Sequence, residues 1–127
     1  MSNRQLVDKF EQTIKINGKT ITATIRICTF ADDEDVKGSF DFGNEADNEA
    51  YLQRFYSGEL TSVVIEVSAS ALNCEGRDLL GACHIKQSRF TKDVMETIEH
   101  YGMIKTACAE LKREILATAE RMKEVLA

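Results

Sequence analysis

Residues 10–30 read FEQTIKINGKTITATIRICTF, and this stretch predicts an antiparallel hairpin. The dipeptide Asn17-Gly18 is typical of a type I′ turn, because both central residues of that turn need a positive φ. A two-residue loop at these positions pairs residues whose numbers add to 35, so that Ile14 faces Ile21. Turn type and register are therefore predicted together.

The two faces of this hairpin differ in polarity. The face expected to lie on a core carries Phe10, Ile14, Ile16, Ile21, Ile25 and Ile27. The opposite face, expected to meet solvent, carries Thr20, Thr22, Thr24 and Arg26. Alternation with a period of two is typical of a strand that buries one side.

The segment after the hairpin predicts a loop and then a short helix. Residues 31–43 carry too much charge for a central strand, although residues 40–42 (FDF) alternate as in a short edge strand. Asn44 or Asp47 can cap the following helix, and Gly58 can end it.

The next part of the chain predicts a second hairpin. Residues 59–70 alternate as a third strand, with its apolar side chains on one face. A turn over Asn73–Asp78 is expected to lead to a short strand, Leu79–Ile85. Gly81 within that strand indicates a bulge or the close approach of another backbone.

Apolar residues recur at steps of three and four from Thr91 to the end, which predicts a long helix that Gly102 interrupts. A straight helix of this length would reach roughly 55 Å. The far end should therefore pack on a second subunit, as a homodimer, or bend back at Gly102. The expected fold class is α+β: one domain over 1–127, with an antiparallel sheet of about four strands, a short middle helix and a long C-terminal helix.

Composition favours a cytoplasmic protein without membrane segments, in the host cell if a phage encodes it. The chain has 127 residues, no apolar run near the roughly 18 that a bilayer requires, and no apolar core in its first residues. Its four cysteines are far apart and contain no CxxC pair, so they are expected to pack as small apolar residues.

The histidines and cysteines do not form a recognisable catalytic or metal site. Cys83 and His84 are neighbours in a predicted strand and so point to opposite faces, which predicts a packed thiol and a surface imidazole. A zinc site from Cys74, Cys83 and His84 would need one more ligand, and its spacing matches no compact zinc motif. No catalytic residue, cofactor or metal is predicted, and the chain is expected not to be an enzyme.

The net charge of −5 is concentrated in one acidic stretch. Residues 31–50 hold eight carboxylates, namely Asp32, Asp33, Glu34, Asp35, Asp41, Glu45, Asp47 and Glu49. Lys37 is the single cation there, so the stretch has a charge of −7. This balance argues against direct binding of nucleic acid and favours a basic protein partner, a cation or simple solvation.

A calcium site is one possible use of this stretch. Residues 33–38 (DEDVKG) resemble the start of a calcium loop, with oxygen ligands at the first and third places and glycine at the sixth. Lys37 occupies a place that needs a ligand, and Asn44 stands where the loop needs glutamate. A solvated acidic loop is the better interpretation.

Residues 58–111 resemble small acidic proteins encoded by phages and mobile elements. The shared pattern is G-x-D-x-LG-x-C, met here by Gly76, Asp78, Leu80, Gly81 and Cys83. Proteins of this general kind include inhibitors of host nucleases and defence complexes, such as anti-CRISPR proteins. The resemblance implies an inhibitor, and it assigns no site residues.

These observations predict a non-enzymatic, phage-type inhibitor of a host nucleic-acid-handling or defence protein. The eight carboxylates would contact a basic, nucleic-acid-binding surface through charge-assisted hydrogen bonds. The alternative is a homodimeric domain that senses a small ligand or a metal, with its site between the sheet and the long helix.

Overall fold

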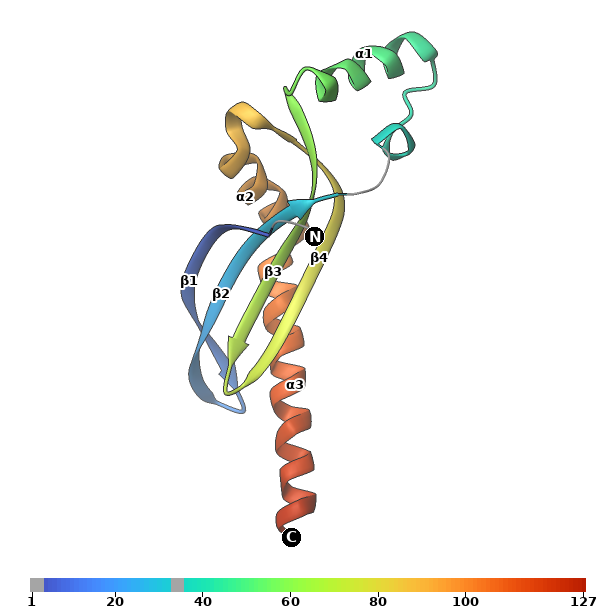
Figure 1. Cartoon of the computed structure of the whole chain (residues 1–127). Helices are drawn as coiled ribbons and strands as arrows, with labels where there is room; N and C mark the ends of the chain where they lie inside the picture. The colour runs from blue at the N-terminus through green and yellow to red at the C-terminus, as the bar shows by residue number, and fades with distance from the viewer. Residues whose placement is uncertain (1–3, 33–35) are drawn as a thin grey trace.

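The chain forms a four-stranded antiparallel sheet that curves around one long helix (Figure 1). The computed structural model describes residues 4–32 and 36–127. The elements in chain order are β1 (Gln5–Ile16), β2 (Lys19–Ala31), the 3-10 turn η1 (Val36–Ser39), α1 (Glu45–Tyr56), β3 (Leu60–Ala71), β4 (Cys74–Lys86), the 3-10 turn η2 (Gln87–Arg89), α2 (Phe90–Tyr101) and α3 (Met103–Leu126). The predicted α+β class, with four strands and a long last helix, is confirmed.

The first hairpin has the predicted turn and register. Asn17 and Gly18 take φ values of 50° and 80°, as a type I′ turn requires. Ile14 pairs with Ile21, and this register runs as far as Asp8 opposite Ile27, beyond which it shifts by one residue. Ile25 is fully buried on the inner face, whereas the threonines of the outer face are mostly exposed.

The second hairpin turns earlier than predicted. Leu72 and Asn73 are its two turn residues, with φ values of 52° and 61°. β4 therefore begins at Cys74, so the expected turn over residues 73–78 is wrong, and the strand expected over Leu79–Ile85 is part of a longer strand. A leucine in a positive-φ position is rare, so local chemistry gave no sign of this turn.

Gly76 is buried inside β4, where the strand lies directly on α3. A Cβ atom at this position would overlap the carbonyl oxygen of Ala107 and the amide nitrogen of Leu111. Glycine is thus required for the close approach of two backbones, not for a turn. Gly81 marks a bulge as predicted, because Val63 pairs with Cys83 while Ile65 pairs with Leu80.

The helical region bends at Gly102 and does not fold back. Gly102 takes a left-handed conformation with φ of 61° and separates α2 from α3. The buried residues of α3 are Met103, Ala107, Cys108 and Leu111, and the helix then continues past the end of the sheet (Figure 1). Within the described residues, no helix is both long and apolar enough to cross a bilayer.

The core lies between the inner face of the sheet and the helices. Ile27, Ile65 and Val67 from the strands and Val94 from α2 have no exposed surface. The inner face of β3 is the predicted one, since Val63 and the alternate residues after it are buried. This layer of apolar side chains provides the main stabilisation of the fold.

Candidate functional site

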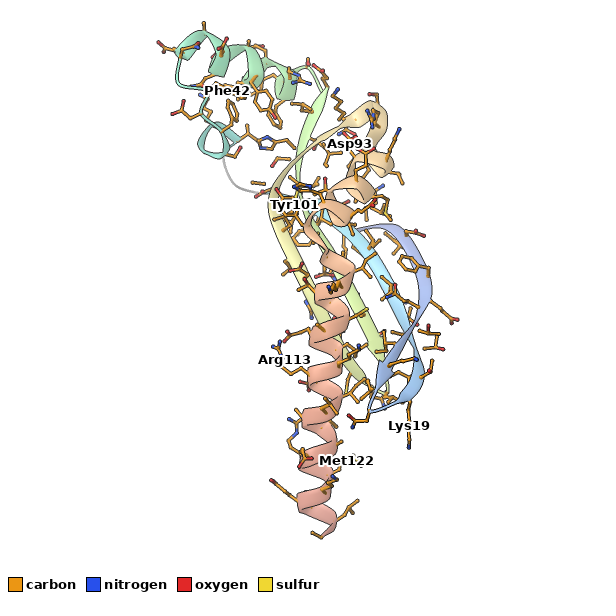
Figure 2. The ribbon with its side chains drawn as sticks, turned by 180° about the vertical axis from the view of Figure 1, so that it is seen from behind. Lys19, Phe42, Asp93, Tyr101, Arg113 and Met122 are labelled. Carbon is orange, nitrogen blue, oxygen red and sulfur yellow. The ribbon has the colours of Figure 1, made fainter. Side chains whose placement is uncertain are left out.

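Residues 36–58 form a separate lobe, here called the acidic lobe, at one end of the sheet (Figure 1). It contains η1 and α1 and lies at the opposite end of the molecule from the C-terminus of α3. Phe42, labelled in Figure 2, lies in this lobe. The short edge strand expected at residues 40–42 is wrong, because this segment packs on α1 and joins no strand.

A reciprocal cap fixes the start of α1. The Asn44 Oδ1 atom accepts a hydrogen bond from the Asp47 amide at 2.8 Å, and the Asn44 side-chain amide donates to Asp47 Oδ2 at 2.6 Å. Of the two predicted cap residues, Asn44 is therefore the cap, and Asp47 is its partner in the first turn. Gly58, with φ of 84°, follows the helix end as predicted.

His84 of β4 lies at the centre of an aromatic cluster that joins the lobe to the sheet. The Tyr51 hydroxyl is 2.9 Å from Nδ1 of His84, and Ser39 Oγ is 2.9 Å from Nε2. The Phe55 ring centroid is 5.0 Å from that of His84, and Phe40 stands edge-on to the imidazole. The imidazole predicted at the surface is only partly exposed, because the lobe covers the outer side of β4 at this point.

The hydrogen bonds around His84 indicate a structural role. The Ser39 hydroxyl donates to the Val36 carbonyl oxygen at 2.7 Å, so its hydrogen is not free to bond to the imidazole. Nε2 must then donate to Ser39, and Tyr51 donates to Nδ1. Burial lowers the pKa of His84, which the nearby Asp32 carboxylate partly offsets, so the neutral form is favoured at pH 7.

The structure separates the eight predicted carboxylates into three groups. Asp33, Glu34 and Asp35 lie outside the described residues. Asp32 braces the β4 bulge, because its Oδ2 atom accepts a hydrogen bond from the Ala82 amide at 2.7 Å. The remaining four, Asp41, Glu45, Asp47 and Glu49, are exposed on the acidic lobe.

The loop before α1 holds the first of these four carboxylates in place. Asp41 accepts hydrogen bonds from the Gly43 amide at 2.8 Å and from the Asn48 side chain at 3.2 Å. The Gly43 bond, and then the Asn48 bond, lower the pKa of Asp41. Asp41 therefore keeps its negative charge to a lower pH than an ordinary aspartate does.

Two open grooves on the lobe combine carboxylates with aromatic surface. One, of about 260 Å³, has Phe40 and Leu52 beside Glu45 and Glu49. Lys37 also lines this groove. Such a groove suits the apolar stem and charged head of an arginine or lysine side chain.

The second groove, of about 310 Å³, has Phe42 and Tyr51 beside Asp47. Arg54 lines it too, and its guanidinium is bound to Glu59 at 2.9 Å and stacks over Tyr51. The Arg54 charge is thereby offset by Glu59. Both grooves thus present acidic rims next to exposed ring surface.

The structure does not bring the candidate zinc ligands together. Cys74 and Cys83 lie at opposite ends of β4, and His84 points to the other face of the strand. Cys74 contacts the Thr118 hydroxyl at 3.6 Å, and the Cys83 thiol donates to the Leu80 carbonyl at 3.3 Å. Among the described residues, no group of three or more potential ligands is placed to hold a metal ion.

The last turns of α3 expose apolar side chains beyond the sheet. Met122, labelled in Figure 2, is 57% exposed, and Val125 and Leu126 are more exposed still. The helix bends at Gly102 but does not fold back over these side chains. Dimerisation through this end of α3 therefore stays a prediction. Light scattering at tens of micromolar is the test, and a monomer would contradict it.

Comparisons with protein-family models, curated proteins and solved structures found no match to this chain.

Proposed function

We propose that this chain is a non-enzymatic binding protein that uses its acidic lobe to block a host nucleic-acid-handling or defence protein. The observation that carries the proposal is the exposure of Asp41, Glu45, Asp47 and Glu49 on a lobe at one end of the sheet. A phage or mobile-element origin, and action in the host cytoplasm, follow from the resemblance of residues 58–111.

The chemistry of the lobe fits a basic protein surface. Proteins that bind nucleic acid hold phosphates with arginine and lysine side chains, and carboxylates can accept the same charge-assisted hydrogen bonds. The grooves beside Phe40 and Phe42 add ring surface on which the apolar stems of these side chains can lie.

The shape of the molecule favours docking by the lobe. The lobe joins the sheet through the end of β2 and the start of β3, and it extends away from both hairpin turns (Figure 1). Tyr56 is 63% exposed and Phe42 is 54% exposed, so both rings are accessible to a partner. Exposed aromatic rings among charges are typical of protein interfaces.

The lack of a base for Ser39 supports a binding role over catalysis at this place. His84 donates to the serine and does not accept from it, so the pair lacks the proton transfer that a nucleophilic serine needs. The neighbours of His84 are hydroxyls and rings that fix the lobe to β4. His84 is therefore a positioning residue for the proposed interface.

The experiment compares two triple variants with the parent protein in affinity capture from bacterial lysate. The lobe variant combines Glu45→Gln, Asp47→Asn and Glu49→Gln, with circular dichroism to confirm the fold. The control variant carries Glu114→Gln, Glu120→Gln and Glu124→Gln on exposed turns of α3. The parent and the control should capture the same stoichiometric partner, and capture should weaken as salt shortens the screening length below about 10 Å.

A captured partner then allows a kinetic test. The lobe variant should associate more slowly than the control, with a difference that shrinks at higher salt, because surface charge acts mainly on the association rate. Bound parent protein should also prevent the partner from binding nucleic acid. Equal association rates for parent and lobe variant at low salt would refute the proposed interface.

A further inference from the structure

A pocket of about 440 Å³ lies between the inner face of the sheet and the start of α2. Its polar lining comes from Thr29 and Thr61 on the strands, Gln5 on β1, and Gln87 and Thr91 at the helix. None of its described lining residues belongs to the acidic lobe, so the pocket is independent of the proposed function. Its volume is within the range of small-molecule sites.

Thr29 is the most informative residue of this pocket. It is 2% exposed, and its hydroxyl has no hydrogen-bond partner among the described residues. Every fully enclosed side-chain nitrogen or oxygen in the described part of the chain does have a partner. The Thr29 hydroxyl must therefore open onto the pocket, which it lines.

The position of Thr29 in β2 makes a hydroxyl without a protein partner unexpected. The inner face of this strand runs Ala23, Ile25, Ile27 and then Thr29, so valine would continue an apolar series without changing the shape. A hydroxyl at a position that is 2% exposed has little access to water, whereas a methyl group at the same place needs none. A ligand that enters the pocket and bonds to this hydroxyl would explain why the position holds threonine.

The rest of the lining defines the chemistry of the occupant. No Lys, Arg, Asp or Glu is among the described lining residues, and the hydroxyl and amide groups can both donate and accept. Val63 and Phe90 add apolar surface. Asp93, labelled near the start of α2 in Figure 2, accepts a hydrogen bond from the Lys86 amide and pairs with Arg89 at 3.4 Å, so its charge is largely offset. The uncharged lining of the pocket therefore favours a neutral ligand.

We infer that this pocket binds a small neutral ring compound with several hydroxyl or amide groups and one apolar face. Nucleosides and monosaccharides share this chemistry. The Thr29 hydroxyl, at the buried end of the pocket, bonds to the ligand, and the exposed glutamines close over its polar edge. Phe90 lies against the apolar face of the ring.

The test is a two-dimensional amide NMR titration of the full chain, with uridine in one series and glucose in another. One of the two probes should give saturable shifts centred on Thr29, Thr61 and Thr91, and the series that responds separates the nucleoside from the sugar. Thr29→Val should weaken that binding by about tenfold, because one buried hydrogen bond is lost. Thr22→Val, on the outer face of the same strand, is the control and should bind as the parent does.

Two results would overturn the inference. The first is the absence of saturable shifts at these amides with both probes. The second is equal affinity of the parent and the Thr29→Val protein for the probe that binds. The amide spectrum of each variant shows whether it is folded, so a loss of binding cannot be mistaken for a loss of structure.

Discussion

Two regions of the molecule, the sheet with α3 and the acidic lobe, are stabilised by different kinds of contact. Ile25, Ile27 and Ile65 have no exposed surface, and they belong to a continuous apolar layer. In the described part of the lobe, Leu52 alone is buried. The lobe depends instead on ring contacts and on the two hydrogen bonds of His84, a residue of β4.

This difference means that the two regions should respond to different changes. The sheet and α3 should be sensitive to volume and backbone fit, because close-packed interiors tolerate little overlap. The lobe should be sensitive to the loss of a few specific contacts and to the charge of His84. It should also be able to unfold while the sheet stays intact.

The largest expected effect is that of Gly76→Ala in the sheet. The new Cβ would overlap backbone atoms of Ala107 and Leu111, which cannot move without shifting α3. We expect a loss of about 3 kcal/mol in the free energy of unfolding, measured by urea denaturation. Gly81→Ala in the same strand is the control, since within the described part of the chain its Cβ would meet only Asp32, at 4.0 Å. Equal denaturation midpoints for the two variants would contradict the close contact.

A smaller and local effect is expected from Leu52→Ala in the lobe. Loss of this buried side chain should destabilise α1 by about 2 kcal/mol, because a cavity replaces the main apolar contact of the helix. Hydrogen exchange should become faster in residues 45–56 and stay unchanged in β2 and β3. Gln53→Ala, at an exposed position of the same helix, should change neither. Faster exchange throughout the sheet would show that the two regions unfold together.

Most of the sheet could be predicted because its signals are local. The turn residues Asn17 and Gly18 and the alternation around them agree on one register, which the structure confirms. The start of β4 could not be predicted in this way. Leu72 takes a positive φ that its residue type disfavours, and Gly76 meets α3, a helix far along the sequence.

The acidic lobe differs from the sheet in how much of it could be predicted from the sequence. Its helix and cap residue are local features and were predictable, but its attachment to β4 depends on His84 meeting Ser39 and Tyr51, which no spacing rule connects. The aromatic residues gathered between Phe40 and Phe55 were the one sequence signal of a small cluster. The sequence also did not indicate that Thr29 lines a pocket, because threonine is common in strands.

The first hairpin offers a third test, with a moderate expected effect. Gly18→Val places a β-branched residue at φ of 80°, a conformation that only glycine adopts readily. Among the residues that the structure describes, no atom lies within 4 Å of the new Cβ, so the effect should come from backbone strain alone. We expect a loss of about 1 kcal/mol or more, measured as the urea midpoint. An unchanged midpoint would show that the turn tolerates the substitution and that its type does not set the register.

A pH-dependent effect should be confined to the lobe. Burial lowers the pKa of His84 below its value of 6.5 in an unfolded chain. The stabilisation from the neutral imidazole is therefore complete above pH 6.5 and is lost as the pH falls towards the folded-state pKa. Hydrogen exchange in α1 should become faster below pH 6.5 relative to β3, and His84→Gln should remove this dependence. The exposed His100→Gln variant should keep it. The effect should be small, because solvent reaches part of this cluster.

The smallest expected effect on stability belongs to Thr29→Val. The hydroxyl has no partner among the described residues, so its replacement by a methyl group should leave the free energy of unfolding unchanged or raise it by up to about 1 kcal/mol. Leu52 and His84 stabilise the region in which they lie, whereas Thr29 would lower the stability of the sheet and recover it only through a bond to a ligand. The urea midpoint of the ligand-free protein measures this directly. A loss of about 1 kcal/mol or more would mean that the hydroxyl is bonded within the folded chain, and the reason to assign the pocket a ligand would disappear.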